Sequence, residues 1–262
     1  MSRFPFSAKL GIAILSLVFL TAVFAPLIAP YDPFEMGAAY QKPSSEHLLG
    51  TNDVGQDILS ELIYGTRVTL TVGLVSALVI TLVGTALGIF GGYFGGVADR
   101  ICSALVNIAL SLPSLALTIV LVAYLNTSLR NLILAICITA WAPTTRIIRS
   151  RVQQIRELPF IKTEKTMGAS SLSIILRHIV PNIGDIVFTR GVLMVGTAML
   201  MEASLSFLGL GVLGQKSWGD TLHYAFFRNG IITGAYWWYV PPIICISLTV
   251  LGTMLLGNRR KK

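Results

Sequence analysis

The chain has 262 residues, of which 54% are hydrophobic and only 12% are charged, and its mean hydropathy is +0.74. Soluble domains carry roughly 25% charged residues, so too little polar surface is present to cover a water-soluble globule. The net charge of +8 comes from basic residues that stand between apolar runs, not among exposed aromatic residues, which excludes a nucleic-acid partner and indicates the lipid bilayer.

Six apolar runs follow one another along the chain, each long enough to cross a bilayer as a helix, which takes about 20 residues. The first, Leu10–Ala29, is too long for the apolar core of a signal peptide, so we expect an uncleaved first helix. The others lie at about 68–92, 104–125, 131–148, 183–208 and 236–257. The sequence therefore predicts an all-α, polytopic membrane protein.

Two parts are expected within this architecture. Residues 1–66 form an N-terminal transmembrane helix and an extracytoplasmic segment, with a short helix near Asp57–Tyr64, and residues 67–262 form a core of five transmembrane helices. The distribution of Lys and Arg favours both termini in the cytoplasm. In that orientation the inside residues are Arg3, Lys9, Arg100, Arg146, Arg149, Arg151, Arg156, Lys162, Lys165, Arg177, Arg259, Arg260, Lys261 and Lys262, and the outside residues are Lys42, Arg67, Arg130, Lys216 and Arg228.

Glycines recur at every fourth position through the second span, at Gly84, Gly88, Gly92 and Gly96. This step keeps them on one helix face, where the missing side chains let another helix approach closely. Glycine is also common in membrane helices generally. The strict register nevertheless favours a packing face.

The polar segment from Arg146 to Pro181, between the fourth and fifth spans, has the pattern of a helix-turn-helix. Pro159 starts a helix, Gly168 fits its C-terminus, and Ser170 or Ser171 caps a second helix that stops at Pro181. The pattern alone is equally compatible with an amphipathic pair on the lipid surface and with a docking element for a cytoplasmic partner.

Motifs for catalysis, nucleotides or metals are weak. Gly209–Ser217 resembles a phosphate-binding loop, but Gln215 interrupts the pattern and no strand precedes it. The three cysteines and three histidines have no metal-ligand spacing, so no metal site is expected. Glu202 lies well inside the fifth span, where a carboxylate has either a structural role or a place on the translocation path.

Three blocks resemble one known family, the inner-membrane permease subunits of ABC importers in the dipeptide, oligopeptide and nickel branch. The first block is His47–Asp57, HLLGTNDVGQD, continued by Gly65–Leu70. The second is Trp141–Asn182, which looks like the family's cytoplasmic loop that docks on the ATPase subunit. The third is Glu202–Gly211 followed by Trp218-Gly219.

The resemblance implies a transport subunit, not an enzyme, in a cell-membrane importer of di- or oligopeptides or a related solute such as nickel complexes. Its implied partners are a homologous permease subunit, two ATP-binding subunits and an extracytoplasmic solute-binding protein. No cofactor is expected on this chain, since ATP and Mg²⁺ would belong to the partners. The implied coupling residues are Phe160, Lys162, Glu164, Gly168, Ala169, Ser170, His178 and Pro181.

The docking loop departs from the family pattern, because Lys162 stands where a Glu is usual, and Glu164 is the nearby acid that could partly replace it. Two other functions compete with that of an importer subunit. A secondary transporter or channel predicts ionisable groups clustered at the midplane, and only Glu202 qualifies. A membrane-bound enzyme predicts convergent catalytic groups, and the sequence suggests none.

Overall fold

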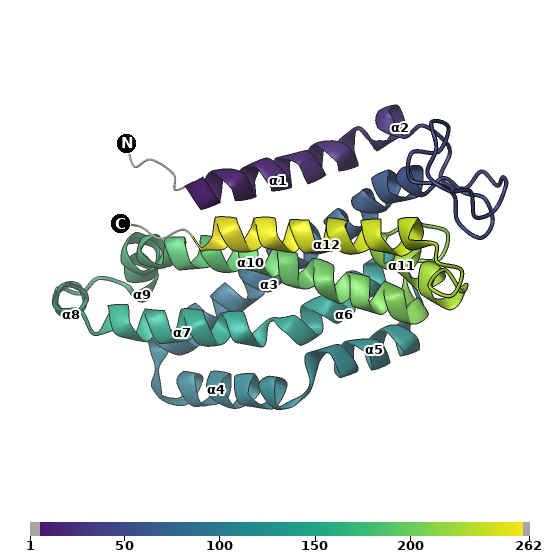
Figure 1. Cartoon of the computed structure of the whole chain (residues 1–262). Helices are drawn as coiled ribbons and strands as arrows, with labels where there is room; N and C mark the ends of the chain where they lie inside the picture. The colour runs from purple at the N-terminus through teal and green to yellow at the C-terminus, as the bar shows by residue number, and fades with distance from the viewer. Residues whose placement is uncertain (1–5, 259–262) are drawn as a thin grey trace.

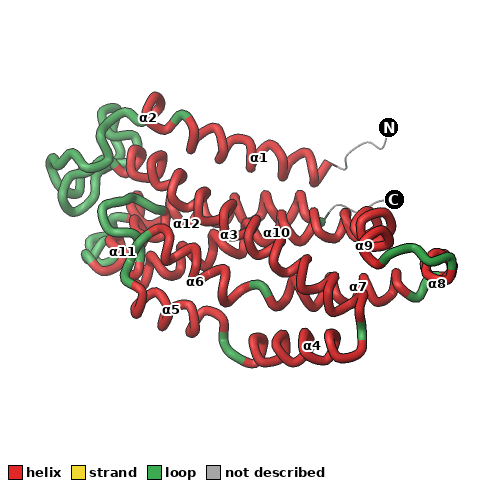
Figure 2. Tube along the Cα trace, turned by 180° about the vertical axis from the view of Figure 1, so that it is seen from behind, coloured by secondary structure: helices red, strands yellow, loops and turns green. Residues whose placement is uncertain are grey.

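The computed structural model describes residues 6–258, which form helices joined by loops, with no β-strand in this range (Figures 1 and 2). The basic residues Arg3, Arg259, Arg260, Lys261 and Lys262, and both chain ends, lie outside the described residues. The helices are α1 Phe6–Val23, α2 Ala25–Ile28, α3 Ile58–Phe94, α4 Gly96–Ser111, α5 Ser114–Leu125, α6 Leu129–Ala140, α7 Ala142–Arg156, α8 Pro159–Thr166, α9 Ser171–Ile174, α10 Val180–Leu205, α11 Trp218–Phe227 and α12 Tyr236–Gly257. Two π-helical segments, η1 Ile175–Ile179 and η2 Ser206–Leu210, flank α10.

The expected number of membrane spans is confirmed for the described residues. Four continuous helices, Phe6–Val23, Ile58–Phe94, Ser171–Leu210 and Tyr236–Gly257, are long and apolar enough to cross a bilayer. Two bent helix pairs, α4 with α5 and α6 with α7, bring the number to six when each pair is counted as one span. The predicted sixth span, 236–257, has the same bounds as α12.

Two spans that the sequence predicts as straight are broken. The α4 and α5 axes differ by 83°, and the α6 and α7 axes by 43°. Leu112, the last residue before Pro113, is extended, because a residue that precedes proline disfavours the helical region. Pro143 lies in the first turn of α7, where its missing N–H is tolerated, so a new helix starts directly after Trp141.

The first span and the segment after it also differ from the prediction. The helix α1 ends at Val23 rather than Ala29, and Pro26 lies in the first turn of the short α2 that follows. The short helix expected near Asp57–Tyr64 is the beginning of α3, which runs without a break from Ile58 to Phe94. The predicted division after residue 66 therefore falls inside α3.

The helix α3 is the centre of the molecule. It lies between α7 and α10, while α12 packs between α10 and α1 (Figure 1). The largest core clusters join α3 to α6 and α10, and the end of α3 at Ile58 to α11 and α12. With 37 residues, α3 is about 55 Å long, which exceeds the roughly 30 Å of a bilayer core. The helix α3 therefore extends beyond the bilayer core and connects the two ends of the molecule, which lie outside the membrane.

Candidate functional site

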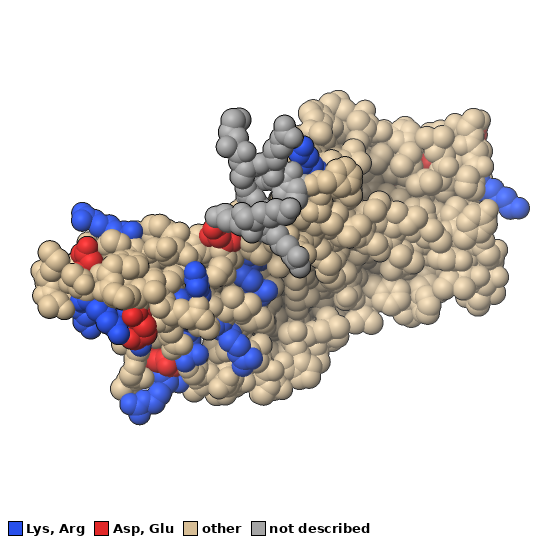
Figure 3. All heavy atoms as spheres, turned by 60° about the vertical axis from the view of Figure 1, so that its left-hand side comes forward, with Lys and Arg blue, Asp and Glu red and all other residues tan. Residues whose placement is uncertain are grey.

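Charged side chains gather at the end of the molecule that carries α8 and α9, beside a broad uncharged surface (Figure 3). We call residues 159–181 the tip segment. Exposed basic residues on it are Lys162, Lys165 and Arg177, and the helix α7 that leads to it exposes Arg146 and Arg151. The apolar surface along the spans exposes many large hydrophobic side chains, as expected where lipid is the solvent.

Local sequence shapes the tip segment much as predicted. Pro159 is in the first turn of α8, and Gly168 adopts φ +84° just after it, the left-handed conformation that ends helices. The Ala169 N–H donates to the carbonyl of Glu164 at 3.1 Å, which closes the turn. Ser170 caps α9 by accepting from the Ser173 N–H at 3.3 Å.

The predicted stop at Pro181 is wrong. The second helix continues through η1 into α10, and Pro181 lies in the first turn of α10. A π-helical turn changes the hydrogen-bond register from four residues to five. Pro181 has no N–H to donate, and it is accommodated directly after the π-helical turn, where the hydrogen-bond register changes. The helix therefore continues from the tip segment into a membrane span without a break.

One face of the tip segment is anchored and the other is exposed. Ile161 and Ile179 are buried against the end of α7 at Val152 and Ile155. The outward face carries Phe160, 44% exposed, together with Met167, Leu172 and Leu176, which are exposed to 79%, 66% and 58%. Exposed apolar side chains of this size, set among basic residues, are typical of a surface that contacts another protein.

Two charged side chains of the tip segment, Lys162 and Glu164, have partners within the chain. Lys162 Nζ lies 3.0 Å from Glu157 Oε2, and Glu164 Oε1 lies 3.7 Å from His178 Nε2. Hydrogen bonds from Lys162 and Arg156 hold the pKa of the Glu157 carboxyl below its usual value. The Phe160 ring contacts the His178 ring edge-on, with centroids 5.8 Å apart.

The helix α7 links the tip segment to the membrane spans. Arg149 forms a two-pronged ion pair with Asp99 at the start of α4, and its second contact measures 2.9 Å. Gln153 donates to the same carboxylate at 3.0 Å. Arg156 Nη1 donates to the carbonyls of Gly92 and Tyr93 at the end of α3, each at 3.3 Å. These contacts clamp α7 between α3 and α4.

Three glycines of the predicted row lie against α7. A Cβ atom built on Gly84 would be 2.9 Å from Thr144 Cγ2, and one on Gly88 would be 2.8 Å from Ile148 Cβ. On Gly92 it would be 2.8 Å from the carbonyl oxygen of Arg149. The helices α3 and α7 therefore approach each other so closely at these positions that only glycine, which has no Cβ atom, fits between them.

Gly96 does not belong to this row, which corrects the sequence prediction. The helix α3 ends at Phe94, and Gly95 and Gly96 both have positive φ, so the four-residue register is lost before Gly96. No atom lies within 4 Å of a Cβ built on Gly96. Gly91 has a contact instead, with Cys102 of α4.

Glu202 lies in protein, with 1% of its surface exposed. It accepts a hydrogen bond from Ser206 Oγ at 2.7 Å, and the Thr69 and Ser217 hydroxyls face the same carboxyl group. These groups come from α3, η2 and the cap of α11.

A buried polar cluster at the opposite end was not predicted from the sequence. Lys216 Nζ lies 2.5 Å from Glu61 Oε1 and 2.8 Å from Gln56 Oε1. Asn52 donates to the same two oxygens at 3.1 and 3.0 Å. The Lys216 and Glu61 side chains are only 10% and 3% exposed. The sequence offered one hint of this cluster, an acid (Glu61) in the first turn of a predicted helix. Its partner Lys216 lies 155 residues away, so the pair leaves no local pattern.

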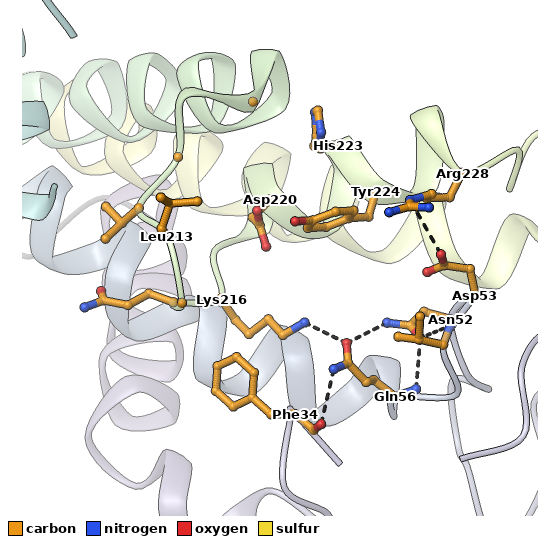
Figure 4. A pocket seen from close by; sticks show the side chains of 16 residues that line it. Phe34, Asn52, Asp53, Gln56, Leu213, Lys216, Asp220, His223, Tyr224 and Arg228 are labelled. Carbon is orange, nitrogen blue, oxygen red and sulfur yellow. Dashed lines mark hydrogen bonds and ion pairs between the residues drawn. The ribbon is translucent and has the colours of Figure 1, made fainter. Parts of the chain in front are cut away.

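This cluster forms the floor of a pocket of about 320 Å³ (Figure 4). The loop 209–216, the loop around Asn52 and the helix α11 surround it. Asp220 and Tyr224 of α11 line one side, and Arg228, 3.8 Å from Asp53, lies at the rim. The glycine-rich loop that resembles a phosphate loop is thus one wall of this pocket, and its lysine is held by a carboxylate.

Comparisons with known proteins agree with this architecture. Residues 84–259 match the model of the family "Binding-protein-dependent transport system inner membrane component", and residues 7–47 match the N-terminal transmembrane domain of oligopeptide transport permease C. The dipeptide transport system permease protein DppC of Alkalihalophilus pseudofirmus is 36% identical over 254 residues, covering 96% of this chain and 83% of the relative. The oligopeptide transport system permease protein OppC of Bacillus subtilis is 32% identical, covering 96% of this chain and 82% of the relative.

The fold has a solved counterpart. The MetNI methionine ABC transporter, in an inward-facing conformation, contains a chain that superposes with a TM-score of 0.58 at 17% identity, covering 77% of this chain and 94% of that one. At this identity the likeness concerns the fold alone. Together with the family match over most of the sequence, it leads to one conclusion: this chain is a multi-pass inner-membrane transport subunit that belongs to the family of binding-protein-dependent transport system inner membrane components.

Proposed function

We propose that this chain is one of two permease subunits of an ATP-driven importer that takes up di- or oligopeptides or a related small solute. The observation that carries the proposal is similarity at 31–36% identity, over nearly the whole chain, to permeases named for dipeptides, oligopeptides and peptides. Relatives named for glutathione, a tripeptide, extend the same chemistry. Nickel complexes stay a related alternative.

The proposed partners are a homologous permease, two ATP-binding subunits and an extracytoplasmic solute-binding protein. The tip segment supports an ATPase contact, because its outward face combines exposed apolar side chains with basic ones. ATP and Mg²⁺ would be bound by the partners, and this chain would contribute no nucleotide ligand. Lys162 and Glu164 would act through their pairs with Glu157 and His178, which shape the exposed surface.

The proposed coupling path runs from the tip segment through α7 to α3. Force on Phe160 or Met167 would reach α7 through the buried Ile161, and α7 is clamped to α3 and α4 by Arg149 and Arg156. Such a two-state motion needs rigid elements joined by firm contacts. The close packing along the glycine row meets this requirement.

Transport assays test the proposed function. The chain is reconstituted into proteoliposomes with the permease, ATPase and binding-protein subunits, and uptake of a radiolabelled dipeptide is measured with and without ATP. We expect uptake only when ATP and the binding protein are both present. Uptake in the absence of ATP would contradict the proposal and favour a secondary transporter or channel.

Gly168 provides a test of coupling. Proline fixes φ near −65° and lacks the N–H that Gly168 donates to the Lys165 carbonyl at 3.2 Å, so Gly168→Pro should break the turn and lower uptake at least tenfold relative to ATP hydrolysis. Gly168→Asn is the matched control, because asparagine tolerates the left-handed conformation and no neighbouring atom obstructs a side chain there. Normal uptake by the Pro variant would refute the docking role.

The proposed orientation places the tip segment and both termini in the cytoplasm. Met167, 79% exposed, and Leu213, 83% exposed, mark the two ends of the molecule. Each is replaced by cysteine in a background without Cys102, Cys137 and Cys245, and intact cells are treated with an impermeant thiol reagent. We expect labelling at position 213 only, and labelling at position 167 alone would reverse the orientation.

A further inference from the structure

The pocket at the proposed extracytoplasmic end contains one acid, Asp220, that forms no close ion pair with any described residue. Lys216 is paired with Glu61, and Arg228 lies 3.8 Å from Asp53. Asp220 also lines the pocket, and among the described residues it has no ion-pair partner within 4.0 Å. The two acids and two bases of the lining balance in number, and with Glu61 behind Lys216 the group of charges sums to −1, with Asp220 as the acid that has no ion pair of its own.

The position of Asp220 is not explained by helix capping alone. Its backbone N–H donates to the Ser217 hydroxyl at 3.1 Å, so it lies in the first turn of α11, where an acid is favourable. An exposed acid would serve that purpose equally well. Asp220 is instead half-buried, and this burial raises the pKa of its carboxyl, opposed by the charges of Lys216 and His223.

The surroundings of Asp220 suit a cation. Figure 4 shows its carboxyl group and the Tyr224 ring directed into the same hollow, with Phe34 on the opposite wall. Lys216 Nζ already lies 5.3 Å from the centre of the Phe34 ring. Aromatic faces attract ammonium groups, and a nearby carboxylate supplies the charge-assisted hydrogen bond.

We propose that this pocket binds the free ammonium end of the transported peptide, with Asp220 as its counter-ion. The volume of about 320 Å³ is at the lower end of the range for small-ligand pockets and suits a di- or tripeptide. The permease would then have a cargo site of its own, separate from the binding protein. This inference rests on the proposed function, since it concerns a peptide cargo.

Direct binding to the complete transporter tests the site. The permease pair with its ATPase subunits, without the binding protein, is placed in nanodiscs, and saturation-transfer NMR measures binding of alanylalanine and of its N-acetylated form. Acetylation removes the ammonium charge and preserves the remainder of the molecule. We expect the free dipeptide to bind about tenfold more tightly, the effect of one charge-assisted hydrogen bond.

Two variants locate the effect. Asp220→Asn should abolish the preference for the free dipeptide, while Glu46→Gln should retain it, because Glu46 is an exposed acid at the same end outside the pocket. Melting curves verify that both variants are folded. Equal binding of both dipeptides by the unmodified complex, or a retained preference in Asp220→Asn, would overturn the inference. Absence of ATP-driven dipeptide uptake in the complete system would instead refute the proposed function.

Discussion

The contact between α3 and α7 predicts that replacing glycine by alanine lowers the free energy of unfolding at Gly88, which lies in this contact. The same replacement should not lower it at Gly184, which lies outside the contact. A Cβ added at Gly88 would lie 2.8 Å from Ile148 Cβ and 3.0 Å from the backbone nitrogen of Arg149. Carbon atoms prefer separations of about 3.5–4.0 Å, so the two helices would have to move apart by roughly 0.7 Å or more. Neither the β-branched side chain of Ile148 nor the backbone at Arg149 can move aside easily to make room for the added carbon atom.

The magnitude follows from two opposing terms. Overpacking a close contact destabilises by about 1–3 kcal/mol. Replacing glycine by alanine inside a helix stabilises by roughly 0.5–1 kcal/mol. Gly88→Ala should therefore lower the free energy of unfolding by up to about 2 kcal/mol. Gly184 of α10 is the control, because no atom lies within 4 Å of a Cβ built there and only the stabilising term applies.

The assay compares the two variants under identical conditions. Unfolding of the purified protein in mixed detergent micelles is followed by helical circular dichroism, and unfolding free energies are taken from the transition. We expect Gly88→Ala to be less stable, and Gly184→Ala to be as stable as the original chain or more so. Larger side chains should act in the same direction, so Gly88→Leu and Gly92→Leu should impair assembly of the complex. A change of equal sign and size for the two alanine variants would refute the packing argument.

Two further predictions concern buried carboxylates. Lys216→Met leaves the Glu61 carboxylate buried without its cation and should destabilise the chain by about 3–5 kcal/mol, whereas the double variant with Glu61→Gln should recover most of this loss, as measured by melting curves. Glu202→Gln keeps the hydrogen bond with Ser206, so a structural role predicts retained uptake, while Glu202→Ala should lower the melting temperature. Loss of uptake by the Gln variant at unchanged melting temperature would indicate that the charge of Glu202 lines the translocation path.

The sequence predicts those features that depend on neighbours along the chain. Apolar run length identifies the spans, and Pro159, Gly168 and Ser170 mark helix ends whose geometry the structure reproduces. Proline alone predicts helix ends less well, because it can either end a helix or occupy the first turn of the next one. Pro181 enters α10, and Pro113 bends a span by 83°.

Features that depend on contacts across the fold could not be predicted. The glycine register identifies a face of α3, but it does not reveal that α7 covers it or that the row ends before Gly96. Glu61 and Lys216 are far apart in sequence and each resembles an ordinary surface charge. Their burial follows only when α3 extends beyond the membrane and the loop 209–216 folds back over its first turn.

The length of α3 gives these separate contacts a common consequence. At its Phe94 end, α3 is joined to α7 and α4 through Arg149, Arg156 and the glycine row, next to the tip segment. At its Ile58 end, it carries Glu61, which holds the loop that forms one wall of the pocket. An unbroken helix resists compression and bending over this distance. A displacement of the tip segment that rotates or tilts α3 therefore also moves Glu61, and with Glu61 the wall of the pocket. The two ends of the subunit are thus mechanically linked, and this link requires no rearrangement of the apolar core.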